Sequence, residues 1–143
     1  GLEGDVSDFG SFASFLHREH TNVWIGDGRA VGRLHFDPYE NLLAQVSGGK
    51  NFTLFAPLRN EELYEGHMRE AETEFDPETG RFRLRTLLDS TRMVMSPIDL
   101  SLPHAQVLAE YPLFERAWRE RVQCDLKAGE ILYLPAFWWH EVR

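Results

Sequence analysis

The chain has 143 residues, of which 43% are hydrophobic, and it carries a formal net charge of -8. This length suits one domain with a real core, so we expect a single domain over residues 1–143. Its only cysteine, Cys124, excludes an internal disulfide framework and a cysteine-based zinc site. The acidic charge argues against a nucleic-acid-binding surface and mildly favours basic partners.

The distribution of apolar residues bears on location. No run of about 18 apolar residues is present to span a membrane, and the first residues lack the basic segment of a signal peptide. We therefore predict a cytoplasmic or nuclear protein that makes no membrane contact.

The first half of the chain predicts one helix and the beginning of a sheet. Phe9, Phe12, Phe15 and Leu16 have near-helical spacing, and "NVWIG", residues 22–26, has the composition of a strand. From residue 34 the period changes to two. The segments "LLAQV" and "NFTLF" flank Gly48 and Gly49, which predicts a tight hairpin.

The second half predicts a hairpin, interrupted helical turns and three strands. Residues 70–85 form a hairpin around a loop from Pro77 to Gly80, with Glu74 opposite Arg83. Helical turns over residues 102–118 are interrupted by Pro112, and three short strands over 123–142 are separated by Gly129 and Pro135. Many short strands with few helices indicate a mainly β sandwich or barrel, and we favour a jelly roll.

The stretch "LHFDPYEN" contains the first candidate ligands. Residues two apart on a strand point to the same face, so His35 and Asp37 converge while Leu34 and Phe36 face the other way. One imidazole and one carboxylate make two-thirds of a metal site. An isolated His-x-Asp is nevertheless common by chance, and buried histidines usually only satisfy hydrogen bonds.

A third ligand must come from one of the remaining histidines: His17, His20, His67, His104 or His140. We favour His140, because it lies in the strand-like run "FWWHEV" after a turn and a proline. Two histidines and one carboxylate hold one face of an octahedral metal, as in non-haem Fe(II) oxygenases. Zinc is the alternative metal.

Lys50 extends the hypothesis from a metal to a cosubstrate. A two-residue turn at Gly48 and Gly49 would pair Ser47 with Lys50 and place Lys50 on the same side as Asn41. A lysine aimed into a barrel is costly unless it meets an anion. A dicarboxylate such as 2-oxoglutarate would chelate the metal and present its far carboxylate to Lys50. A lysine that simply points to solvent is the alternative.

These two segments, "LHFDPYENLLAQVSGGKNFTLFAP" and "LKAGEILYLPAFWWHEV", resemble the JmjC (Jumonji-C) domain of the cupin superfamily, closest to the small JmjC protein hydroxylases. The resemblance covers residues 23–143. It implies a double-stranded β-helix, Fe(II) held by His35, Asp37 and His140, and 2-oxoglutarate held by Lys50 and Asn41. It also implies O2 as cosubstrate and a protein or peptide substrate, with lysine among the targets.

Two departures from the family pattern stand out. Gly32 occupies a position where the family often has a threonine that helps to bind the cosubstrate. The chain also stops three residues after His140, before the family's last strand, so we expect it to be part of a longer protein with an open sheet edge.

Other functions share parts of this pattern. Demethylation of methyl-lysine uses the same iron chemistry. A non-oxygenase cupin, such as a metal-dependent isomerase, would keep the ligands but would not need Lys50 in the pocket. A binding module would keep the barrel without catalysis. The pair His17 and His20 is three apart, but an exposed polar helix end explains it better than a metal site.

Overall fold

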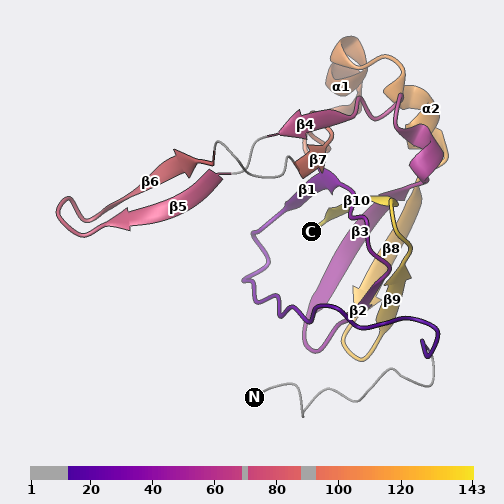
Figure 1. The fold of residues 1–143 in the computed structure, drawn as a ribbon. Helices are drawn as coiled ribbons and strands as arrows, with labels where there is room; N and C mark the ends of the chain where they lie inside the picture. The colour runs from indigo at the N-terminus through magenta and orange to yellow at the C-terminus, as the bar shows by residue number, and fades with distance from the viewer. Residues whose placement is uncertain (1–12, 69–70, 88–92) are drawn as a thin grey trace.

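The computed structural model describes residues 13–68, 71–87 and 93–143 (Figure 1). Within these residues the fold is mostly β, with one large antiparallel sheet and few helices. This architecture is consistent with the predicted jelly roll.

The large sheet has six strands in the order β4-β7-β1-β10-β3-β8. All of its pairings are antiparallel, and chain order is not followed, because β1 and β3 lie on either side of β10. The strands are β1 Gly32–His35, β3 Gly49–Phe55, β4 Gly66–Met68, β7 Met93–Met95, β8 Val122–Lys127 and β10 Trp139–Val142.

Two smaller sheets and two short helices complete the described elements. One sheet pairs β2, Asn41–Ala44, with β9, Ile131–Leu134, and the other pairs β5, Ala71–Asp76, with β6, Arg81–Thr86. The helices are α1, His104–Glu110, and α2, Phe114–Arg119, and a single 3-10 turn covers Pro57–Arg59. The break between α1 and α2 at Pro112 confirms the predicted interruption, and β8, β9 and β10 confirm the three predicted C-terminal strands.

The large sheet is apolar on both faces. Alternation along β3 sends Phe52 and Leu54 to one face and Phe55 to the other. The helix-side core contains Leu34, Phe55, Leu63, Ile98, Val107, Phe114, Ala117 and Trp139. The inner core, between the large sheet and the β2-β9 pair, contains Phe52, Leu54, Leu126 and Leu134. A strand of this sheet therefore presents alternate side chains to two different cores.

The β5-β6 hairpin confirms its prediction in both loop and register. Glu74 is opposite Arg83 and Glu72 is opposite Arg85, and the Arg85 Nη2 to Glu72 Oε2 distance is 2.6 Å. The hairpin extends away from the rest of the domain (Figure 1). Its charged face is solvated, as expected, and it contributes nothing to the inner core.

The predicted tight hairpin at Gly48 and Gly49 is wrong. β2 pairs with β9 rather than β3, and β3 pairs with β10 and β8. The segment after β2 instead bonds to the turn between β8 and β9, with Gln45 N donating to Glu130 O at 3.0 Å and Ala128 N donating to Gly48 O at 3.1 Å. Because these backbone groups find partners across the sandwich, the chain passes from one sheet to the other at Gly48.

The N-terminal predictions also fail where the structure tests them. Phe9 and Phe12 lie outside the described residues, and Phe15 and Leu16 lie in a turn closed by Leu16 N donating to Ala13 O at 2.9 Å. Residues 22–26 form no strand. Trp24 is 76% exposed and Ile25 is 95% exposed, so this apolar segment has no described neighbour to pair with.

Asp99 ties β1 to the loop that follows β7. Its Oδ1 accepts from Ser101 Oγ at 2.6 Å and from Ser101 N at 2.9 Å, and its Oδ2 accepts from Arg33 Nη1 at 3.0 Å. The Ser101 hydroxyl first, then the Ser101 amide and Arg33, lower the pKa of Asp99 to about 2. The ionised carboxylate is therefore the form that stabilises this connection.

We expect Asp99→Ala to lower the free energy of unfolding at pH 7 by about 1 kcal/mol, a modest value because part of the side chain is exposed. A depressed folded-state pKa stabilises the protein above the unfolded-state pKa, and that stabilisation is lost as pH falls through the folded-state value. The difference between wild type and variant should thus shrink between about pH 4 and pH 2. Urea unfolding at pH 7 and pH 3 measures it, and an equal difference at both would contradict the assignment.

Candidate metal centre

Three side chains from two neighbouring strands meet at one end of the inner face. His35 is the last residue of β1, Asp37 lies two residues further on, and His140 lies in β10. His35 and His140 are direct partners in the β1-β10 register. One ligand atom from each of these three residues lies within 4.8 Å of the others, and this arrangement could hold a metal ion.

Backbone carbonyls orient both imidazole rings. The His35 Nδ1 lies 2.6 Å from Arg33 O, and the His140 Nδ1 lies 3.0 Å from Trp138 O. Because a carbonyl only accepts, each Nδ1 is the donor, and in the neutral imidazole the Nε2 atom carries the lone pair. These Nε2 atoms lie 4.0 Å and 3.7 Å from the Asp37 carboxylate oxygens. Such carbonyl partners on the distal nitrogen are typical of metal-bound histidines.

Burial favours the neutral form of the His140 imidazole. The residue is only 5% exposed, and desolvation lowers the pKa of His140 below its ordinary value despite the opposing hydrogen bond to Trp138. The other two side chains are more open, at 18% exposed for His35 and 40% for Asp37. The cluster is therefore closed behind His140 and accessible from the side of Asp37.

The donor set itself fits a divalent transition metal. Two imidazole nitrogens and one carboxylate on a single face leave the remaining positions of an octahedral ion open. The same donors also suit zinc. The chemistry of the donors thus agrees with the ligand set expected from the sequence, which stays a prediction.

Hydrogen bonds from residues 133 and 137 hold the loop that carries Asp37. No short sequence pattern predicts these contacts. Phe137 N donates to Asp37 O at 2.8 Å, which joins this loop to the residues just before β10. Phe137 has a φ of 65°, an unusual value for a residue with a bulky side chain. A second connection runs from Tyr133 Oη to Glu40 Oε2 at 2.6 Å. The two ligand-bearing segments are therefore joined at the rim of the site.

Lys50 shares the inner face with the histidines, although not through the hairpin expected from the sequence. Leu54 pairs with His140, and Lys50 lies four residues earlier on the same face of β3, roughly 13 Å along the strand. Lys50 is half-buried, and a lysine side chain together with a short dicarboxylate can bridge that distance.

Asn41 reaches the inner face from the other sheet. It pairs with Leu134, a residue of the inner core, so the two side chains share that face. The Asn41 Nδ2 donates to Tyr39 O at 3.3 Å. Asn41 and Lys50 thus approach the same space from opposite sheets rather than from two arms of one hairpin.

Gly32 lies beside the same face. A β-carbon at this position would lie 3.5 Å from the Val142 Cβ, an ordinary contact distance. The structure therefore leaves room for a β-carbon at this position.

The other histidines do not join the cluster. His17, His20 and His67 are exposed, and His104 pairs with Glu115 at 2.9 Å near the helices. Among the residues that the structure describes, only one group of three His, Cys, Asp or Glu side chains is arranged to hold a metal.

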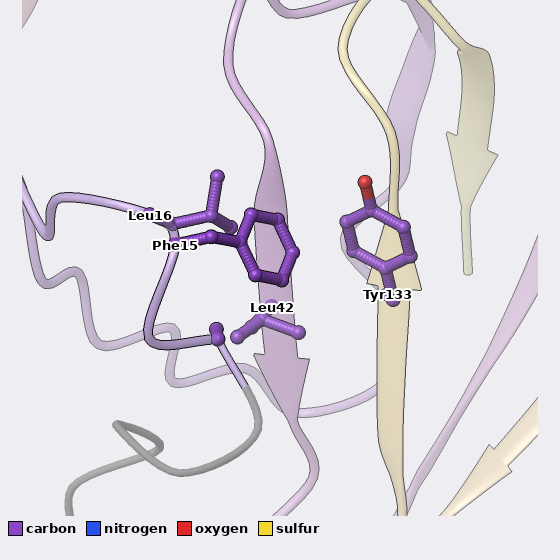
Figure 2. A pocket seen from close by; sticks show the side chains of 5 residues that line it. Phe15, Leu16, Leu42 and Tyr133 are labelled. Carbon is purple, nitrogen blue, oxygen red and sulfur yellow. The ribbon is translucent and has the colours of Figure 1, made fainter.

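An apolar pocket of about 280 Å³ lies elsewhere, on the outer side of the β2-β9 pair (Figure 2). Leu42 and Tyr133 are register partners, and alternation turns them away from the face of Asn41 and Leu43. Phe15 and Leu16 line the pocket with them. It has no metal-binding side chain among its lining residues, so we do not assign chemistry to it.

Comparison with known proteins identifies relatives across nearly the whole chain. A model of the cupin-like domain family matches residues 2–143. The human "Bifunctional peptidase and (3S)-lysyl hydroxylase JMJD7" is 37% identical over 122 residues, covering 85% of this chain and 37% of that protein. The Arabidopsis thaliana "Lysine-specific demethylase JMJ32" is 33% identical over 143 residues, covering 98% of this chain and 41% of that protein.

A third relative is named neither a hydroxylase nor a demethylase. The human "tRNA wybutosine-synthesizing protein 5" is 33% identical over 108 residues, covering 76% of this chain and 25% of that protein. These matches confirm the resemblance to JmjC proteins. The chain spans about two fifths of the length of the first two relatives, at 37% and 41%. Within the described residues, no helix has the length and apolar character that crossing a membrane requires.

Proposed function

We propose, from the premise that this chain belongs to the cupin-like family, that it is a non-haem iron oxygenase dependent on Fe(II) and 2-oxoglutarate. The reaction that we infer is hydroxylation of a protein side chain, with lysine favoured. Oxygen and 2-oxoglutarate are consumed, and succinate and CO2 are released. The observation that supports it most is the convergence of His35, Asp37 and His140, with the Nδ1 atom of each imidazole held by a backbone carbonyl.

Each residue has a separate role in this proposal. His35, Asp37 and His140 would hold the iron, and Lys50 would neutralise the far carboxylate of 2-oxoglutarate, with Asn41 donating from the opposite sheet. When bound, iron and 2-oxoglutarate supply the oxidising chemistry. The protein supplies the geometry and keeps water from the buried side of the site, where His140 is 5% exposed.

The choice of a lysine substrate rests on weaker support. The human relative JMJD7 is named a lysyl hydroxylase. The chain's net charge of -8 would also attract a basic peptide over long range. Because relatives with demethylase names also match, at 33% and 30% identity, removal of a methyl group from methyl-lysine is the second candidate.

Product mass separates these reactions. The protein would be incubated with Fe(II), 2-oxoglutarate and a library of basic peptides, with and without lysine methylation, and each peptide would be weighed by mass spectrometry. Hydroxylation adds the mass of one oxygen atom, whereas demethylation removes that of a methylene group. Succinate formed without any change in a peptide would refute the proposed substrate class, and failure to bind 2-oxoglutarate would favour an isomerase or a binding module.

A further inference from the structure

Trp139 lies directly behind the candidate metal centre. It is fully buried, and it precedes His140 in β10, so its indole faces the helix-side core while His140 faces the inner core. Phe36, which lies between His35 and Asp37 in the chain, contacts this indole edge to face, with ring centroids 4.9 Å apart at 85°. The two ligand-bearing segments therefore meet again behind the sheet.

A single polar contact anchors this indole. The Trp139 Nε1 donates to Asn60 Oδ1 at 2.6 Å, across 79 positions of sequence. The ring otherwise packs in an apolar cluster, so without Asn60 the indole N–H would be a buried donor lacking its partner.

Asn60 lies on a loop that is itself well held. It follows the 3-10 turn, and its carbonyl accepts from Glu65 N at 3.3 Å. Leu63 N donates to Arg59 O at 2.9 Å, and Arg59 Nη1 lies 3.1 Å from Glu62 Oε1. These contacts therefore hold in place the loop that carries the indole's acceptor.

We propose that Asn60 is a positioning residue for the metal centre, acting through Trp139. With the acceptor removed, the indole can shift or rotate toward another partner, and this movement displaces Phe36 and the start of β10. His140 and Asp37 then lose their common geometry. The inference rests on the proposed metal role of these two side chains. Loss of a group that hydrogen-bonds directly to a metal ligand typically changes metal affinity 10- to 100-fold, and Asn60 acts through one further residue, so we expect an effect near the lower end of that range.

Two substitutions test the role of the acceptor. Asn60→Leu removes the acceptor while keeping the branched shape of the side chain, and Asn60→Asp keeps an oxygen at an exposed position where a carboxylate remains solvated. We expect Asn60→Leu to weaken Mn(II) binding about 10-fold or more and to shift the absorption bands of bound Co(II). Asn60→Asp should bind Mn(II) like the wild type and show the wild-type Co(II) spectrum.

Ile98→Val provides the control for a purely structural effect. Ile98 is fully buried in the same core, so the substitution lowers stability without touching the hydrogen bond. We expect it to leave Mn(II) affinity unchanged. The inference would be overturned if Asn60→Leu bound Mn(II) with wild-type affinity. It would also be overturned if Ile98→Val lost as much Mn(II) affinity as Asn60→Leu when the two variants have similar free energies of unfolding.

A metal-free measurement separates this inference from the proposed function. The imidazole NMR signals of His140 should move in Asn60→Leu and stay in place in Asn60→Asp and Ile98→Val. Failure of the wild type to bind Mn(II) would refute the metal role alone, while the NMR signals would still report whether Asn60 sets the position of His140. Unmoved signals in Asn60→Leu would overturn the positioning role.

Discussion

Replacement of Asp37 by alanine is expected to weaken metal binding by more than about 100-fold, beyond the range seen when only a ligand's supporting partner is lost. Asp37 is the only carboxylate of the cluster, with oxygens 4.0 Å and 3.7 Å from the two free Nε2 atoms. Without it, the two imidazoles present no negative charge to a divalent ion. Hydroxylation should be lost with the metal, and Mn(II) titration of wild type and variant measures the change.

Asp27→Ala is the matched control, because it removes an exposed aspartate whose side chain, within the described part of the chain, pairs only with nearby Arg29. It should bind metal like the wild type. Since the Asp37 side chain is 40% exposed, its removal is expected to leave the fold intact, which thermal unfolding can verify. A fully active Asp37→Ala protein would refute the proposed mechanism.

Much of the arrangement around this cluster could be predicted from short segments. His35 and Asp37 share a face because strand alternation is a local property. The strands β8, β9 and β10 could be predicted because Gly129 and Pro135 separate them in the sequence, and the structure contains all three. The residue pattern within a short segment was therefore sufficient to predict which side chains share a face and where a strand ends.

Strand pairing was harder to predict, because a period of two shows which face a side chain occupies but not which strand lies beside it. The Gly48-Gly49 pair is typical of a hairpin, yet the chain crosses between sheets there. Lys50 still faces the inner core, because alternation along β3 relates it to Leu54, the partner of His140. The face was thus correct although the predicted neighbour was wrong.

Long-range polar contacts left no trace in the local sequence. The hydrogen bond from Trp139 to Asn60 and that from Phe137 N to Asp37 O each join segments far apart in the chain. Neither has a spacing or composition that marks it, because an asparagine after a turn and an aromatic residue before a strand occur for many local reasons. Such contacts are determined by the packed fold.

Lys50→Ala is expected to weaken the binding of 2-oxoglutarate at least about 30-fold while leaving metal binding intact. Lys50 is half-buried, and its ammonium is the proposed partner of the far carboxylate. Removing one member of a buried charge pair costs about 2–5 kcal/mol, or roughly 30- to 5,000-fold in affinity. Isothermal titration of 2-oxoglutarate into Mn(II)-loaded protein measures this loss directly. His140→Ala should lose cosubstrate binding as well, but through loss of the metal.

Lys127→Ala is a closely matched control, because Lys50 and Lys127 are the only lysines in the chain. Lys50 pairs with Leu126 on the inner face, so the neighbouring Lys127 points to the outer side of β8 and is exposed. Its removal changes net charge by the same amount but should leave 2-oxoglutarate binding unchanged. Equal losses in both variants would attribute the effect to long-range charge. Loss of 2-oxoglutarate binding in Lys50→Ala alone would place the far carboxylate of the cosubstrate beside Lys50 on the inner face. This position agrees with the separation from His140 that a chelating 2-oxo acid can span.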